Sequence, residues 1–145
     1  MTDTPNALEP VLKFLRQYAP FKQMLPVHQE YLAMYLEQVF YAEADIIIGP
    51  EDGLVDSFYI IKRGCVSGEV IPEQIPELES PVTLLGAGDC FPITALLQNR
   101  AVNFQHRAMK SSICYKLKQA HFEYLMQQST VFRDFYIPKS QAQCH

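Results

Sequence analysis

The chain has 145 residues, of which 48% are apolar and 19% are charged, and its formal net charge is −4. These values predict a single globular domain with a buried core and exclude an intrinsically disordered chain. There is no basic stripe, no run of 18 apolar residues and no secretory signal at the start. We therefore expect a cytoplasmic protein with no nucleic-acid partner and no membrane contact.

Helices are predicted at the start of the chain, over residues 1–38. Thr4 and Pro5 suit the cap and the first position of one amphipathic helix, which Pro20 should end. A second helix is expected to begin at Pro26. Both segments carry apolar residues at three- and four-residue spacing.

Short strands are predicted over residues 39–118. The run Ser57–Lys62, SFYIIK, is rich in the aromatic and β-branched residues that favour strands. Glycines and prolines punctuate the runs, and the acidic, proline-rich segment 72–81 predicts a surface loop. About eight short strands of this kind indicate a sandwich or a double-sheet roll.

Helices return over residues 119–137. Gln119–Gln128 has apolar residues at helical spacing, and Ser129 or Thr130 can cap a further helix that Pro138 should end. The chain is therefore expected to form one mainly β domain with α-helices at both ends.

The segment 84–103, LLGAGDCFPITALLQNRAVN, has the most informative pattern. Its glycines supply a turn, Asp89 offers an N-cap oxygen, and Pro92 suits the first position of a short helix that ends near Leu97. Arg100 follows that helix. Backbone N–H groups at a helix N-terminus and a guanidinium both favour negative charge, so the segment predicts an anion-binding cradle.

This segment resembles the phosphate-binding cassette of the cyclic-nucleotide-binding domain family. That cassette reads Gly-x-Gly-Asp-x-Phe-Gly-Glu, then a small helix that ends Ala-Leu-Leu, then Arg and two small residues. The matching residues are Gly86, Gly88, Asp89, Phe91, Ala95, Leu96, Leu97, Arg100 and Ala101. A second segment, 52–70, resembles a hairpin of the same family. Its matching residues are Gly53, Tyr59, Ile60, Ile61, Gly64 and Val66.

The resemblance implies a double-stranded β-helix, which is a jelly-roll-like β-roll. It implies that the cassette, residues 86–103, binds cyclic AMP, cyclic GMP or another phosphate-bearing ligand, with no required cofactor. Arg100 would contact the phosphate, and backbone N–H groups near Ala95 and Ala101 would donate further hydrogen bonds. The implied ligand-binding residues are Phe91, Pro92, Ile93, Thr94, Ala95, Arg100, Ala101 and Val102.

Two positions depart from the family pattern. Pro92 stands where the family has Gly, and Ile93 stands where it has the Glu that accepts the ribose 2′-hydroxyl. Ile93 cannot accept a hydrogen bond, and an unpaired buried hydroxyl costs roughly 1–3 kcal/mol. Two interpretations therefore stay open: a ligand-sensing regulatory domain, or a degenerate cassette without a nucleotide that acts as an interaction scaffold. The scaffold would dimerise or dock onto its neighbours, and the terminal helices are where we expect a homodimer to form.

The form Phe-Pro-Ile-x-Ala-Leu-Leu resembles one subgroup of the family. Members of that subgroup precede CBS pairs and a nucleotidyltransferase-like domain in bacterial signal-transduction proteins. The resemblance implies that this chain is the N-terminal regulatory module of such a protein.

The sequence indicates no catalytic centre. It has no Gly-x-Ser-x-Gly elbow, no His-Glu-x-x-His helix and no P-loop, so we expect a non-catalytic protein. Four cysteines, at positions 65, 90, 114 and 144, form no Cys-x-x-Cys pair and have no zinc-like spacing with a histidine. We expect them to be reduced thiols without metal.

Overall fold

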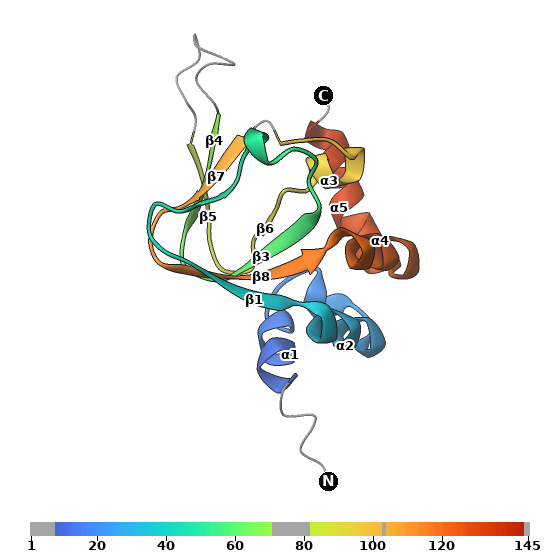
Figure 1. Ribbon diagram of the computed structural model, residues 1–145. Helices are drawn as coiled ribbons and strands as arrows, with labels where there is room; N and C mark the ends of the chain where they lie inside the picture. Colours follow the sequence, from blue (N-terminus) through green and yellow to red (C-terminus); the bar gives the residue numbers. More distant parts are fainter. Residues whose placement is uncertain (1–7, 71–81, 103, 144–145) are drawn as a thin grey trace.

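The computed structural model describes residues 8–70, 82–102 and 104–143, in which two antiparallel sheets are flanked by helices (Figure 1). The predicted fold, mainly β with flanking α-helices, is confirmed. The strands are β1 (Glu37–Tyr41), β2 (Ile46–Ile48), β3 (Ser57–Arg63), β4 (Val66–Val70), β5 (Val82–Leu85), β6 (Cys90–Phe91), β7 (Phe104–Ala108) and β8 (Ser112–Lys118). The helices are α1 (Glu9–Leu15), α2 (Pro26–Tyr35), α3 (Thr94–Gln98), α4 (Gln119–Gln128) and α5 (Thr130–Gln143), with short 3-10 turns at Phe21–Gln23 and Pro50–Asp52.

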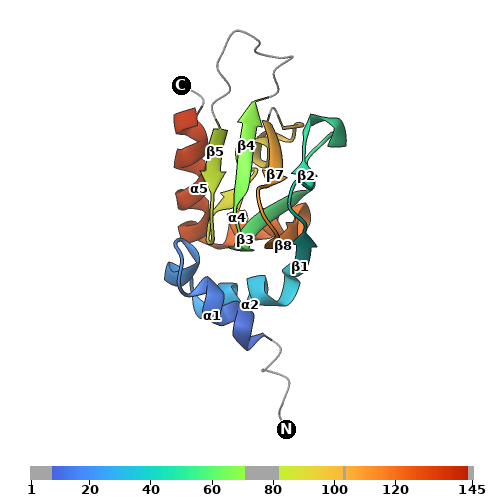
Figure 2. The same cartoon turned by 90° about the vertical axis from the view of Figure 1, so that its left-hand side faces the viewer.

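Each sheet has four strands, in the orders β1-β8-β3-β6 and β2-β7-β4-β5. The first four strands of the chain pair antiparallel with the last four in reverse order: β1 with β8, β2 with β7, β3 with β6, and β4 with β5. This pairing is that of a jelly roll. Figure 2 looks onto the second sheet, in which β5, β4, β7 and β2 lie side by side.

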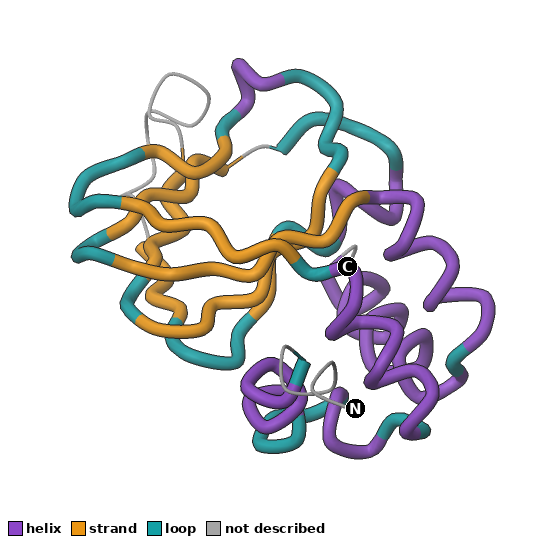
Figure 3. Tube along the Cα trace, turned by 60° about the horizontal axis from the view of Figure 1, so that its bottom comes forward, coloured by secondary structure: helices purple, strands orange, loops and turns teal. Residues whose placement is uncertain are grey.

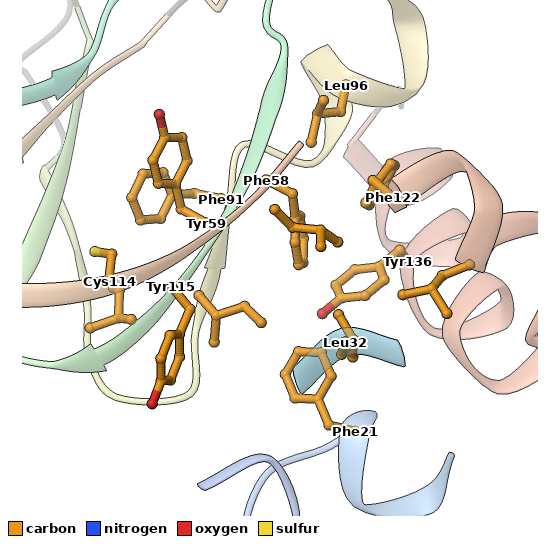
Figure 4. Packing of buried hydrophobic residues seen from close by; sticks show 14 of the residues in the cluster. Phe21, Leu32, Phe58, Tyr59, Phe91, Leu96, Cys114, Tyr115, Phe122 and Tyr136 are labelled. Carbon is orange, nitrogen blue, oxygen red and sulfur yellow. The ribbon is translucent and has the colours of Figure 1, made fainter. Parts of the chain in front are cut away.

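Strand β3 is covered on both faces, and its first five residues are all buried. Phe58 packs against α4 and α5, where its ring centroid lies 5.0 Å from that of Phe122 and 5.6 Å from that of Tyr136. The next side chain, Tyr59, points to the other face and stacks on Phe91 with centroids 5.2 Å apart (Figure 4). Successive strand residues face opposite ways, which explains why this run is apolar throughout.

Helices α1 and α2 pack against the first sheet, and Figure 3 shows the strands gathered on one side of the molecule and most of the helices on the other. Leu15, Phe21 and Leu32 from this N-terminal part are fully buried. The ring of Phe14 lies 5.5 Å from that of Tyr115 on β8. The N-terminal helices therefore share the core of the roll.

Two predicted helix ends are wrong. Helix α1 ends at Leu15 and not at Pro20, because the chain tightens first: the N–H of Tyr18 donates to the carbonyl of Leu15, three residues back, at 3.2 Å. Helix α5 passes Pro138 and ends at Gln143. A proline inside a helix removes one N–H donor, while the following residues can keep helical geometry.

Some predictions fall outside the described residues. These are the helix start at Thr4 and Pro5, the loop at 72–81, the last cassette residue Asn103, and Cys144. Of the helices in the described ranges, none is long and apolar enough to cross a membrane.

Candidate ligand-binding site

A cavity of about 580 Å³ lies between the cassette and the second sheet. The sheet contributes residues of β4, β5 and β7, and the cassette contributes β6, the start of α3 and the segment after that helix. Seven of the eight predicted site residues line this cavity: Phe91, Pro92, Ile93, Thr94, Ala95, Arg100 and Val102. The eighth, Ala101, is half-buried and does not line it.

The cassette begins with a turn that is fixed to β3. The backbone N–H of Gly88 donates to the carbonyl of Ile61 at 2.8 Å, and the N–H of Ile61 donates to the carbonyl of Asp89 at 2.9 Å. Gly88 has a φ of +90°, and a Cβ at this position would overlap the ring of Tyr18. Only glycine meets both conditions, so the family-like glycine here has a steric cause.

The prediction that Asp89 caps the cassette helix is wrong. The Asp89 carboxylate instead accepts a hydrogen bond from the N–H of Gly86 at 2.8 Å, which closes the turn before β6. Cys90 and Phe91 then pair with β3 as a short strand. Helix α3 begins only at Thr94, so Pro92 precedes the helix and is not its first residue.

Helix α3 ends in a way that returns Arg100 to the cavity. Asn99 adopts the left-handed conformation, with a φ of 53°, which is a common way to end a helix. The N–H of Arg100 then donates to the carbonyl of Ala95 at 3.1 Å. This backbone turn brings Arg100 back beside the start of α3, where it is one of the residues that line the cavity.

The guanidinium of Arg100 has no acidic partner among the described residues. Its Nε donates to Oε1 of Gln98 at 2.7 Å, and its Nη1 donates to the carbonyl of Ala101 at 3.0 Å. These two bonds orient the group without neutralising it, and a guanidinium has more donors than they use. None of the described residues that line the cavity is acidic. The positive charge is therefore available to an anion.

The cavity wall is apolar at the two positions where this chain departs from the family pattern, including the position of the family's hydrogen-bond acceptor. Ile93 lines the cavity and is half-buried, and Pro92 next to it is buried. Neither side chain can accept a hydrogen bond. The departure from the family pattern thus lies inside the cavity itself.

Sequence reasoning missed His106, which lines the same cavity from β7. Its imidazole stacks on Phe91 with centroids 4.6 Å apart and planes 18° apart. Burial lowers the pKa of His106 to about 4, so the ring is neutral at pH 7. The available signal was its alternation on β7 with Phe104, which also lines the cavity.

The cavity wall also contacts the last helix. Sγ of Cys90 lies 3.2 Å from the hydroxyl of Tyr136 on α5, and Tyr136 is almost fully buried. Burial raises the pKa of Tyr136, and its contact with Cys90 adds to that rise. The cavity wall and α5 therefore share a direct side-chain contact. Within the described ranges, no three His, Cys, Asp or Glu side chains are grouped closely enough to hold a metal ion.

A jelly roll with a glycine turn fixed to β3 and an arginine on a cavity is the arrangement of the cyclic nucleotide-binding domains. The chain belongs to the cyclic nucleotide-binding domain family: the model of that family matches residues 38–129, more than half of the chain. No curated protein sequence matches the chain significantly.

Solved structures share the fold at low sequence identity. The regulatory domain of Toxoplasma gondii protein kinase A with cAMP superposes with a TM-score of 0.81 and 19% identity, over 94% of this chain and 51% of that one. The sensor domain of the transcriptional regulator DNR from Pseudomonas aeruginosa gives 0.73 and 14%, over 92% and 93%. The regulatory subunit of a cAMP-independent protein kinase A from Trypanosoma cruzi bound to guanosine gives 0.73 and 20%, over 84% and 43%.

This chain therefore spans about half the length of the kinase regulatory subunits that it matches. At these identities the similarity shows the fold alone.

Proposed function

We propose that this domain is a non-catalytic sensor of a cyclic nucleotide or a related phosphate-bearing ligand. The observation that carries the proposal is Arg100, which lines the cavity and whose guanidinium is held by two neutral acceptors and has no acidic partner among the described residues. An arginine in that state suits a phosphate, which it can bind through two N–H groups at once.

The rest of the cavity suits the other part of a nucleotide. Apolar side chains such as Leu85, Ile93, Val102 and Phe104 supply contact area for a base or a sugar face. Two related folds support this class of ligand: one structure contains cAMP, and another, described as cAMP-independent, contains guanosine.

The response would be a shift between two packings of the C-terminal helices. Phosphate at Arg100 would bias the cassette, and Cys90 beside the cassette touches Tyr136 of α5. A ligand shifts such an equilibrium only as far as its affinities for the two states differ. The Cys90–Tyr136 contact is the point at which that difference would be transmitted.

The test is a calorimetric titration with cAMP, cGMP and inorganic phosphate. Replacing Arg100 with Ala should weaken every anionic ligand by about 1.5–3 kcal/mol, the usual value of a hydrogen bond to a charged group. Arg107→Ala is the matched control, because Arg107 pairs with Glu69 (Nε to Oε2, 3.7 Å) and does not line the cavity. Equal affinities for wild type and the Arg100 variant would contradict the proposal.

A second candidate function is a ligand-free scaffold, and Ile93 favours it. No carboxylate among the described lining residues can accept a ribose hydroxyl, and Pro92 has no N–H to offer a phosphate. Under this alternative the domain would dimerise through its terminal helices, and no ligand in the titration would bind.

We also propose a cytoplasmic setting at the N-terminal side of CBS and nucleotidyltransferase-like domains in a bacterial signal-transduction protein. The support is the resemblance of the segment from Phe91 to Leu97 to that subgroup. The direct test is to sequence the gene beyond the codon for residue 145, where segments that encode CBS and nucleotidyltransferase-like domains are expected and their absence would contradict the proposal.

A further inference from the structure

His106 is a polar side chain in the cavity wall whose hydrogen-bonding capacity is unused. Nδ1 is fully buried, and neither ring nitrogen bonds to any residue that the structure describes. Stacking on Phe91 holds the ring in place. Buried polar atoms are usually paired, so an unpaired ring at a cavity wall needs an explanation.

The neighbouring strand leaves one side of this ring open. Gly68 on β4 lies directly opposite His106 in the strand register. A Cβ at position 68 would lie 3.5 Å from Nε2 of His106, so any larger side chain there would cover that nitrogen. Because Nδ1 is sealed, Nε2 is the nitrogen that a molecule in the cavity can reach.

The chemistry of this ring differs from that of Arg100. Burial lowers the pKa of His106 to about 4, so at pH 7 the ring is an uncharged group with one donor and one acceptor nitrogen. A neutral imidazole adds little to phosphate binding and pairs well with a hydroxyl or a ring N–H. The cavity therefore offers a ligand two different groups: the charged guanidinium donor of Arg100 and the uncharged imidazole of His106.

The other polar side chains that line the cavity are weaker candidates for a contact with a ligand. Thr83 is exposed, Thr94 has a further interaction of its own, and the Cys90 thiol already contacts Tyr136. Ile93 offers no acceptor. His106 is the lining side chain whose need for a partner is unmet within the described residues.

We propose that His106 is a specificity-determining residue of this cavity. Its Nε2 hydrogen-bonds an uncharged hydroxyl or ring N–H group on the ligand whose anionic group Arg100 holds. This inference rests on the proposed function and narrows it. The ligand is a phosphate ester that carries a sugar or a nucleobase, and not a simple inorganic anion.

The experiment is a calorimetric titration with three probes: cAMP, adenosine and inorganic phosphate. His106→Phe keeps a flat ring against Phe91 and removes both nitrogens. It should weaken cAMP and adenosine about tenfold, as expected for a lost hydrogen bond that leaves a ligand group unpaired, and leave inorganic phosphate unchanged. Arg100→Ala should weaken cAMP and inorganic phosphate and spare adenosine.

A second variant guards against a folding defect in the first. Gly68→Ala adds a methyl group at an ordinary contact distance from Nε2 and at a position where the backbone has no positive φ. It should fold as wild type and weaken the same two probes, cAMP and adenosine. Thermal unfolding of each variant checks that the fold is intact.

The outcomes separate this inference from the proposed function. If both variants bind cAMP as wild type does, His106 is not a ligand contact, and the sensing function stands. If wild type binds inorganic phosphate but neither cAMP nor adenosine, the inference is overturned and only an anion site remains. If wild type binds none of the three probes, both the inference and the proposed function are overturned.

Discussion

The hydroxyl of Tyr31 on α2 lies 2.8 Å from Nδ1 of His121 on α4, which joins the first and last helical parts of the chain. Two ring stacks surround this bond: Tyr35 on His121, with centroids 4.0 Å apart, and Tyr31 on Tyr124, with centroids 4.5 Å apart. Desolvation by burial raises the pKa of Tyr31. Both helical ends of the domain are therefore connected outside the core of the roll.

Tyr31→Phe removes this hydrogen bond and keeps both stacks. We expect a loss of about 1 kcal/mol in the free energy of unfolding, the usual value for one hydrogen bond, since the bond is partly buried. Urea unfolding followed by circular dichroism measures it. Tyr124→Phe is the control, because the Tyr124 ring stacks in the same cluster and its side chain is substantially exposed. Equal losses of stability in the two variants would mean that the hydrogen bond between Tyr31 and His121 does not stabilise the fold.

His106 should make stability depend on pH. Its pKa is about 4 in the folded state and about 6.5 in the unfolded chain, so between these values the unfolded state binds the extra proton. The contribution of His106 to the free energy of unfolding is therefore fully present above pH 6.5. It falls by about 2–3 kcal/mol as the pH drops towards 4.

The measurement is the free energy of unfolding in urea at pH 7, 5.5 and 4.5 for wild type and His106→Phe. Carboxylates titrate in both proteins, so the difference between the two curves isolates the histidine. We expect that difference to grow in favour of the variant as the pH falls. A constant difference across the range would show that His106 is not buried and neutral.

Burial raises the pKa of the Cys114 thiol to about 12. Because the thiolate is the reactive form, Cys114 should react with iodoacetamide at pH 8 at least about a thousandfold more slowly than an ordinary cysteine. Cys65, which is half-buried, is the internal comparison. Peptide mapping by mass spectrometry should find Cys114 unmodified in the native protein and modified in urea. Rapid native labelling would contradict the packing of β8.

The fold could be predicted from local patterns because those patterns and the tertiary structure agree. The run in β3 is apolar at every position and is buried on both faces. Ser129 or Thr130 was expected as a cap, and the structure shows Ser129, whose Oγ accepts from the N–H of Phe132 at 3.1 Å. Helix α4 has the predicted bounds, Gln119–Gln128.

The wrong predictions arise where pairing with a distant part of the chain determines the local structure. Asp89 looks like a helix cap in sequence, but the pairing of Cys90 and Phe91 with β3 inserts a strand before the helix. The alternation of His106 with Phe104 along β7 gives the face of the strand, but its place in the cavity depends on the register of β7 against Gly68 of β4. Strand pairing of this kind cannot be read from one segment alone.

The last prediction concerns Ile93, which lines the cavity beside the buried Pro92. If the family geometry applies, the Ile93 side chain lies where a ribose 2′-hydroxyl would sit. Ile93→Glu would supply the missing acceptor, and Pro92→Gly in the same chain would restore backbone freedom. A charged acceptor is worth more than a neutral one, so the double variant should bind cyclic nucleotides about tenfold more tightly, or more.

The comparison with a 2′-deoxy cyclic nucleotide makes this test specific, since only the hydroxyl can use the new carboxylate. A carboxylate in the cavity can also pair with Arg100 and compete with phosphate, so Ile93→Gln with Pro92→Gly provides an uncharged acceptor as a control. The gain should appear with the ribonucleotide for both acceptors and vanish with the deoxyribonucleotide. If the double variants bind the two nucleotides equally, Ile93 does not face the hydroxyl, and the scaffold becomes the better account of this domain.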